Sequence, residues 1–182
     1  MNVCRLLTIA TIFLTELSFA APHPGLSTSL LLNKKSGIYL LPYGFKISLS
    51  DQWTVQVRPS KDDPTTILEA FLSERGWPRL MITKNEISNN SSIESYTKKW
   101  IQNYSNYGFQ IESQKIFQLN GKKAIAIDLT EMKSKTMARQ YIQINEKNVL
   151  IITCSDKQEN FRTAIETCNS LVQTLEWTPK SL

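Results

Sequence analysis

The sequence predicts an α+β domain with a largely antiparallel sheet flanked by helices, and three features support this prediction. Short runs such as Phe45–Leu49 alternate apolar and polar residues, which is typical of strands buried on one face. Asn120-Gly121 lies between two extended runs, and this dipeptide is a strong signal for a β-hairpin. Two longer segments, near residues 92–108 and 156–175, repeat their apolar residues with helical spacing.

The predicted strands occupy much of the chain between Gly37 and Thr153. Trp53–Arg58 continues the alternation after a turn at Ser50–Gln52. Val149–Thr153 is almost entirely apolar, which indicates a central strand buried on both faces. The other predicted strands are Ile67–Ser73, Arg79–Lys84, Phe109–Glu112, Lys115–Leu119, Lys123–Thr130 and Met137–Ile144.

Each predicted helix has a recognisable start. Ser91 and Glu94 have capping-box spacing ahead of the first helix, and Gly108 is placed to end it. The second helix is expected to begin at Ser155 or Asp156, because Asp156 is followed three residues later by a glutamate. The expected buried face of this helix consists of Phe161, Ile165, Cys168, Leu171, Val172 and Leu175.

Residues 1–20 have the layout of a secretory signal peptide. A short basic segment precedes the apolar run Leu6–Leu14, and Ser18-Phe19-Ala20 places small residues before a cleavage site that follows Ala20. An uncleaved membrane anchor is the alternative. The apolar run is shorter than the roughly 20 residues of a spanning helix, and Glu16 interrupts it.

We therefore expect an exported chain that is periplasmic or secreted. Pro22, Pro24 and Gly25 follow the cleavage site, so residues 21–36 are expected to form a flexible lead-in. Residues 37–182 are then expected to form a single globular domain.

The net charge of +5 is dispersed along the chain. Lysine pairs such as Lys98-Lys99 and Lys122-Lys123 lie at separate points, whereas a nucleic-acid surface concentrates basic and aromatic residues. We predict no nucleic-acid partner and at most a peripheral contact with an anionic membrane surface.

Cleavage after Ala20 would remove Cys4 and leave Cys154 and Cys168. An oxidising compartment permits a disulfide between them. With Cys154 at the end of a strand and Cys168 about three turns into the next helix, however, the two would lie about 18 Å apart. A disulfide needs Cα atoms within about 7 Å. The sequence leaves open a bridge made by a returning helix and a pair of buried thiols.

Residues suited to catalysis or metal binding are sparse. His23 is the only histidine and lies in the expected lead-in, so no histidine-based catalytic set is predicted. Asp62-Asp63, in the loop Pro59–Pro64, could bind calcium or could simply be solvated. Glu112 and Asp128 could meet across strands as a carboxylate pair. We predict no catalytic site, no metal site, no cofactor-binding site and no cofactor.

Trp77 is the candidate contact with a partner protein. It lies between Gly76 and Pro78 in a predicted turn, where a large aromatic side chain could serve as an exposed anchor. A tryptophan folded back into its own loop is the alternative.

Several stretches of the chain resemble the Mog1/PsbP-like superfamily, including its bacterial envelope members of unknown function. The stretches are Gly44–Leu49 followed by Trp53, Ser92–Phe109, Leu119–Ala124, and Ile152–Ser155 continuing through Phe161 to Leu175. The resemblance implies an α/β/α sandwich around a largely antiparallel sheet. Members are mostly non-catalytic binding or assembly factors: PsbP-type members attach to a membrane complex, and Mog1-type members bind a small GTPase. No functional residue of those proteins maps onto a matching motif here.

The leading hypothesis is an exported, soluble, non-enzymatic protein that binds another envelope protein or complex, or assists its assembly. One alternative is a module that binds a small molecule or a metal ion. A second alternative is a hydrolase with a carboxylate-based site. The sequence does not set the oligomeric state.

Overall fold

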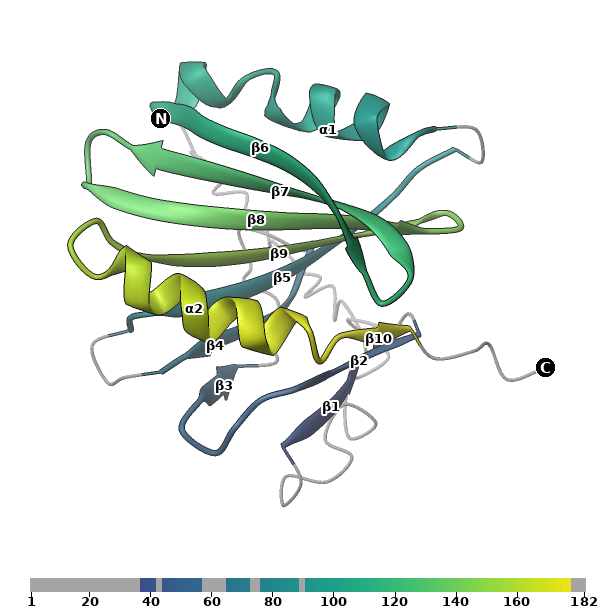
Figure 1. Cartoon of the computed structure of the whole chain (residues 1–182), viewed down its shortest axis with the longest axis horizontal. Coiled ribbons are helices and arrows are strands. Elements are labelled where there is room, and N and C mark those ends of the chain that lie inside the picture. Colours follow the sequence, from purple (N-terminus) through teal and green to yellow (C-terminus); the bar gives the residue numbers. More distant parts are fainter. Residues whose placement is uncertain (1–36, 42–43, 57–64, 73–75, 89–90, 178–182) are drawn as a thin grey trace, which may run out of the picture.

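The computed structural model describes residues 37–41, 44–56, 65–72, 76–88 and 91–177 (Figure 1). The predicted signal peptide, the lead-in with His23, and the Asp62-Asp63 loop lie outside the described residues. The described strands are β1 (Ile38–Leu41), β2 (Phe45–Ser48), β3 (Thr54–Gln56), β4 (Thr66–Phe71), β5 (Arg79–Glu86), β6 (Phe109–Leu119), β7 (Lys122–Glu131), β8 (Thr136–Asn145), β9 (Asn148–Lys157) and β10 (Glu176–Trp177).

These strands form two sheets in the described part of the chain. The larger has seven strands in the order β3-β4-β5-β9-β8-β7-β6, and the smaller has three in the order β1-β2-β10. Every pairing between these strands is antiparallel. β9 lies at the centre of the larger sheet, and its residues Val149–Ile152 are buried, as the apolar run predicts.

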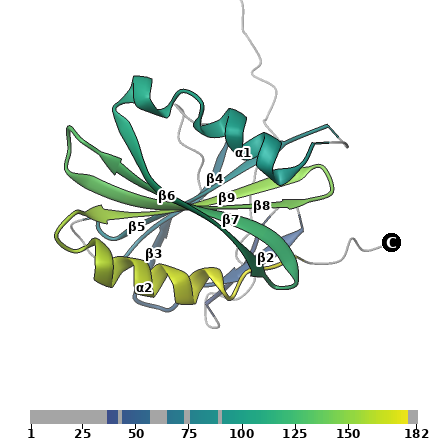
Figure 2. The same cartoon turned by 45° about the horizontal axis from the view of Figure 1, so that its top comes forward.

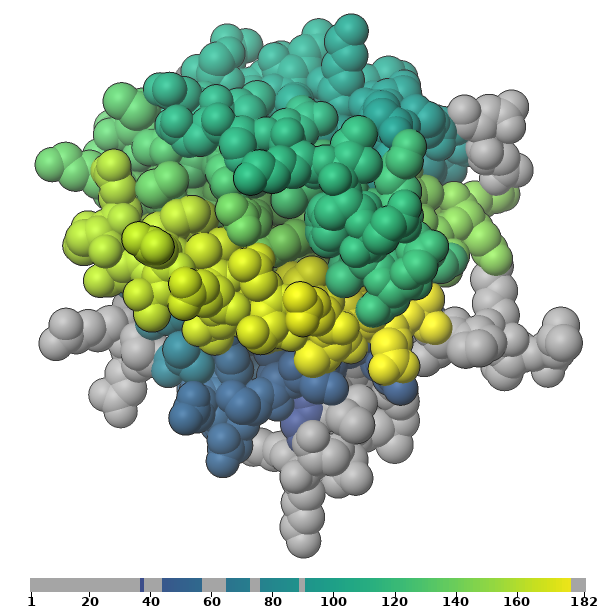
Figure 3. Space-filling model, in the orientation of Figure 1, coloured from purple at the N-terminus to yellow at the C-terminus, as the bar shows by residue number. Residues whose placement is uncertain are grey.

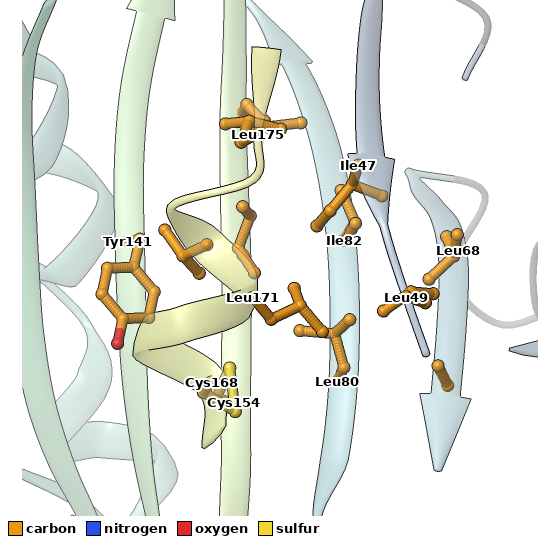
Figure 4. Close-up of a cluster of buried hydrophobic side chains, with 14 of the residues drawn as sticks. Ile47, Leu49, Leu68, Leu80, Ile82, Tyr141, Cys154, Cys168, Leu171 and Leu175 are labelled. Atoms are coloured by element: carbon orange, nitrogen blue, oxygen red, sulfur yellow. A yellow bond between two sulfur atoms is a disulfide. The ribbon is translucent and has the colours of Figure 1, made fainter. Parts of the chain in front are cut away.

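One helix covers each face of the larger sheet, so the predicted α+β sandwich is confirmed (Figure 2). α1 (Ile93–Ile101) packs on β7 and β8 over a cluster that includes Ile127 and Ile142. α2 (Phe161–Val172) packs on the opposite face against β8, β9 and β2. Figure 4 shows this second cluster, which includes Ile47, Leu68, Leu80, Ile82, Leu171 and Leu175.

The first helix starts one residue later than the sequence predicts, and its predicted end at Gly108 is wrong, because α1 stops at Ile101. The Ser92 hydroxyl accepts a backbone hydrogen bond of 3.1 Å in the first turn of α1, so Ser92 is the N-cap. The predicted cap at Ser91 is wrong, because its hydroxyl bonds that of Ser88 instead. A 3₁₀ turn at Tyr104–Tyr107 follows α1, and Gly108 ends it with a φ of 83° that suits a residue without Cβ.

β6 is one continuous strand where the sequence predicts two. The predicted break between Glu112 and Lys115 is wrong, because a β-bulge between Ile111 and Ser113 carries the strand through. A bulge adds one residue without ending the ladder. The following turn at Asn120-Gly121 has φ values of 51° and 74°, so the predicted hairpin is confirmed.

α2 begins at Phe161, and the predicted start at Ser155 or Asp156 is wrong. Ser155 and Asp156 remain in β9, where they pair with Arg79 of β5 and Met137 of β8. Ladder hydrogen bonds to strands on both sides are a tertiary constraint, and such constraints override a local capping pattern.

Cys154 of β9 and Cys168 of α2 form a disulfide, with Cα atoms 6.2 Å apart (Figure 4). The expected separation of about 18 Å is wrong because the helix starts later. β9 runs about 10 Å beyond Cys154 to Lys157, and α2 returns about 10 Å from Phe161 to Cys168. The bridge therefore fastens α2 to the central strand.

The sequence pattern does not predict β1 or β10. β10 contains only Glu176 and Trp177, which pair with Lys46 and Phe45 of β2. Two residues have no detectable period. A side chain of the larger sheet also holds β10 in place, because the Trp177 indole donates a 2.7 Å hydrogen bond to Gln143 Oε1 of β8.

We expect Thr97→Val to stabilise the protein. Thr97 lies on the buried face of α1 with 1% of its surface exposed, and its Oγ1 has no hydrogen-bond partner among the described residues. An unpaired buried hydroxyl is destabilising, so the isosteric valine should raise the free energy of unfolding by about 1 kcal/mol. Urea denaturation measures this change. Thr163→Val, at an exposed position of α2, is the matched control and should change little. A destabilised Thr97→Val variant would contradict the packing described here.

We expect the disulfide to stabilise the folded chain substantially. It closes a loop with a sequence separation of 14, for which the loss of chain entropy in the unfolded state corresponds to about 3 kcal/mol. A reductant should therefore lower the urea midpoint of the wild-type protein but leave that of a Cys154→Ala, Cys168→Ala double variant unchanged. Equal midpoints for oxidised and fully reduced wild-type protein would show that the bridge contributes nothing.

Candidate binding groove between α2 and the edge strand

A groove lies between α2 and the strands β6, β7 and β8. Its volume is about 280 Å³ and it is open on one side. Figure 3 shows this face, with α2 in yellow beside the green and teal strands. The groove, called the α2 groove below, is lined by Ser113, Lys115, Phe117, Leu119, Ala126, Asp128, Arg139, Tyr141, Asn169, Val172 and Gln173.

An ion pair forms the polar end of the α2 groove. Arg139 Nε and Nη2 donate hydrogen bonds to the two carboxylate oxygens of Asp128, at 2.5 Å and 2.8 Å. The Ser113 hydroxyl donates a third bond to Asp128 Oδ2, at 2.9 Å. Asp128 and Arg139 are cross-strand neighbours in the β7–β8 register, so the sheet itself aligns the two side chains.

α2 contributes to the same cluster through Asn169. The Tyr141 hydroxyl donates to Asn169 Oδ1, and Arg139 Nη1 approaches the same oxygen at 3.4 Å. Phe117 stacks edge-on against the Tyr141 ring, with centroids 6.2 Å apart. The polar end thus joins three strands to one helix, while Leu119, Ala126 and Val172 supply apolar walls.

Burial and hydrogen bonding set the charge states in this cluster. Burial raises the pKa of Asp128, but hydrogen bonds from Arg139 and Ser113 outweigh it and hold the pKa below its ordinary value. Burial raises the pKa of Tyr141 to about 12, so its hydroxyl stays neutral. A carboxylate held ionised in this way is a weak base. The cluster is therefore poorly suited to moving protons.

The bulge in β6 decides which side chains reach the α2 groove. Ile111 pairs with Leu129 on the α1 face, but after the bulge Ser113 pairs with Asp128 on the α2 face. Lys115, Phe117 and Leu119 follow Ser113 on the same side and line the groove. Without the bulge, strict alternation from Phe109 would have placed Ser113, Lys115 and Phe117 on the α1 face, together with Phe109.

Glu112 and Asp128 do not oppose each other in the ladder. Glu112 is the extra residue of the bulge, between the pairs formed by Ile111 and Ser113. Asp128 is bonded to Arg139 and Ser113. Within the described residues, no group of three or more histidine, cysteine, aspartate or glutamate side chains is placed to hold a metal ion.

Trp77 is half-buried at a second recess, near the start of α2. This recess has a volume of about 560 Å³ and also involves Leu72 and Asp156. The Lys157 ammonium lies 5.3 Å from the centroid of the Trp77 ring, a cation–π contact. Leu72 and Gly76 border a stretch outside the described residues, so we centre the candidate site on the α2 groove. The role of Trp77 as a partner contact stays a prediction.

The sequence reasoning missed most of the α2 groove. Arg139, Tyr141 and Asn169 were not expected to act together. The sequence did contain a signal, because Asp128 and Arg139 carry opposite charges and lie in consecutive predicted strands. Asp128 lies between Ile127 and Leu129, so its side chain points to the opposite face of the sheet from theirs. The direct pairing of Asp128 with Arg139 requires the register of the β7–β8 turn, which the sequence did not specify.

Comparison with known proteins identifies the fold. No family model and no curated protein matches the sequence. The solution structure of the cyanobacterial PsbP protein CyanoP, from Synechocystis, superposes with a TM-score of 0.62 at 8% identity over 87% of this chain and 98% of that one. The chain has the Mog1/PsbP-like fold. This confirms the resemblance and the α/β/α architecture.

Two other solved structures share this PsbP-like fold. LpqN, involved in cell envelope biogenesis of Mycobacterium tuberculosis, gives a TM-score of 0.57 at 13% identity over 76% of this chain and 87% of that one. PA94 of Pseudomonas aeruginosa, a protein of unknown function, gives 0.52 at 16% identity over 79% and 97%. At these identities the likeness concerns the fold. Separately, none of the described helices has the length and apolar character required to span a bilayer.

We expect Asp128→Asn to destabilise the protein in a pH-dependent way. A carboxylate whose pKa is lowered by folding stabilises the protein above its unfolded pKa of about 3.9, and this contribution is lost as the pH falls through the lower folded value. The pair is mostly buried, with 18% of the Asp128 side chain and 23% of the Arg139 side chain exposed. We therefore expect a loss of about 1–2 kcal/mol at pH 7, between the values for exposed and buried pairs.

Urea denaturation between pH 3 and pH 7 measures this effect. The difference between wild type and Asp128→Asn should shrink below about pH 4. Glu94→Gln, which breaks the exposed Glu94–Lys123 pair, is the matched control and should have a smaller effect at pH 7. A difference for Asp128→Asn that does not change with pH would rule out the ion pair as its source.

Proposed function

We propose that this chain is an exported, non-enzymatic protein that binds another protein of the cell envelope and assists its assembly. The observation that carries the proposal is the α2 groove, because its ordered polar end, apolar walls and open side lie along an exposed strand. Such a surface suits a contact with another protein, since backbone, apolar and charged groups are offered together.

Three further facts support export and an envelope role. The Cys154–Cys168 disulfide is favoured in an oxidising compartment. Residues 1–20 have the pattern of a signal peptide. LpqN, which shares the fold, is a protein involved in cell envelope biogenesis.

A small ligand is a weaker candidate for the α2 groove. Pockets for small molecules commonly have volumes of about 300–1,000 Å³ and enclose most of the ligand. The groove measures about 280 Å³ and is open along one side. Its polar groups also already bond one another, through Asp128, Arg139 and Asn169. These features favour a partner that rests across the groove.

Site-specific photo-crosslinking in the native cell tests the proposed function. A photoreactive residue is placed in turn at Gln114 of β6, Lys98 of α1 and Arg162 of α2, all of which are exposed. We expect one envelope protein to be captured reproducibly from at least one position, and mass spectrometry of the purified chain to show cleavage after Ala20. A correctly exported and folded protein that forms no adduct at any position would contradict the proposal.

A further inference from the structure

We propose that β6 binds its partner by strand addition: an extended segment of the partner pairs with the outer edge of β6. In this arrangement an acidic side chain of the segment faces Lys115 at the mouth of the α2 groove, and its neighbours in the segment are apolar. The inference deepens the proposed function and rests on it, because it assumes a protein partner. Three independent features of β6 support it.

The first feature is an open sheet edge. β6 is an 11-residue strand at the end of the seven-stranded order, and among the described residues only β7 pairs with it. An edge strand leaves one row of backbone N–H and C=O groups without ladder partners. Proteins that recognise extended peptides use such edges, where backbone hydrogen bonds supply affinity and alternate side chains supply specificity.

The second feature is exposed apolar surface on the α1 face of the same edge. Ile111 and Ile116 have 40% and 56% of their surface exposed. Helix α1 packs mainly on β7 and β8, and the 3₁₀ turn Tyr104–Tyr107 contacts β6, with Tyr104 against Phe109 at the start of the strand. Ile111 and Ile116 nevertheless stay exposed. Exposed isoleucines on a long edge strand are unusual, because such edges promote association unless something covers them. An added strand would place its own side chains beside Ile111 and Ile116 and remove them from water.

The third feature is the charge at the groove mouth. Lys115 is exposed and lies on the groove side, while the nearby Asp128 is already neutralised by Arg139. Glu112 is the other charged residue of β6 and lies in the bulge. Among the described residues Lys115 forms no ion pair, although its charge also acts on Asp128. Asp128, Arg139 and Lys115 together leave one net positive charge on the groove side of the strand, which complements an acidic residue across the ladder.

Lys115 also argues against a second copy of this chain as the occupant. Antiparallel pairing of two β6 strands about their middle would bring the two Lys115 side chains close together on one face. Like charges across a ladder are destabilising, and lysines on edge strands act against edge-to-edge pairing. A different protein with an apolar–acidic–apolar segment avoids this repulsion and also covers Ile116.

Peptide binding tests the proposal directly. The probe is a blocked nine-residue peptide in which threonine and valine alternate around a central glutamate, so that glutamate and threonines share one face and valines the other. The matched peptide carries a central lysine. We expect the glutamate peptide to bind better to the wild-type protein in a fluorescence anisotropy titration. Lys115→Glu should weaken its binding about fivefold and strengthen that of the lysine peptide.

Two variants control for charge and position. Lys98→Glu makes the same charge change on the exposed face of α1, and should leave both affinities close to those of wild type. Ile116→Lys changes an exposed side chain, so it should fold normally but weaken binding of both peptides. Amide hydrogen exchange distinguishes strand addition from a contact between side chains, because only strand addition forms new backbone hydrogen bonds. The glutamate peptide should slow exchange in β6 specifically.

Each other outcome overturns the strand-addition proposal. It fails if neither peptide binds at millimolar concentration, if β6 amides gain no protection, or if the charge reversal changes no preference. Self-association that Ile116→Lys abolishes would identify a second copy as the occupant instead. In the crosslinking experiment, adducts from Lys98 or Arg162 but none from Gln114 would reject strand addition and leave the proposed function standing, whereas no adducts anywhere would reject both.

Discussion

The return of α2 over the central strand is the constraint on which the rest of this structure depends. β9 ends at Lys157 and α2 starts at Phe161, so the helix must run back along the sheet, and the Cys154–Cys168 bridge fixes where it lies (Figure 4). That position buries Leu171 and Val172 against the sheet and brings Asn169 within reach of Tyr141 and Arg139. A helix placed elsewhere on this face would fill the α2 groove or abolish it.

The Asp128–Arg139 ion pair beneath α2 makes one end of the α2 groove polar. Partly buried charges are stabilised when they are paired and hydrogen-bonded, and Asp128 meets that condition through Arg139 and Ser113. The pair thus leaves a polar floor in an otherwise apolar interface between helix and sheet. The disulfide and this cluster both hold α2 against the sheet, because Cys168 bonds Cys154 and Asn169 Oδ1 accepts hydrogen bonds from Tyr141 and Arg139.

The sequence predicted correctly those features that depend on neighbouring residues alone, such as tight turns. Asn120-Gly121 makes a tight turn because both positions adopt positive φ, and Gly108 ends its turn for the same reason. The sheet and both helices followed from periodicity. The start of α2 could not be predicted locally, because Ser155 and Asp156 are held in β9 by partners distant in the sequence. The predicted distance between Cys154 and Cys168 was wrong for the same reason, because it was calculated from that helix start. The α2 groove needed both the β7–β8 register and the helix position, so only the opposite charges of Asp128 and Arg139 were visible in advance.

The β6 bulge links the two candidate binding features of the edge. With strict alternation from Phe109, Ser113 and Phe117 would have faced the α1 side of the sheet, where Phe117 could not reach Tyr141. The extra residue instead turns Phe117 into the α2 groove, where it packs on Tyr141, and turns Ile116 to the α1 side. The same residue therefore completes the groove wall and creates the exposed apolar edge. A sequence that needed only a stable sheet would place a polar residue at Ile116, because an exposed isoleucine adds little to folding and favours association. Retaining an isoleucine there is therefore accounted for more readily by a partner strand than by stability.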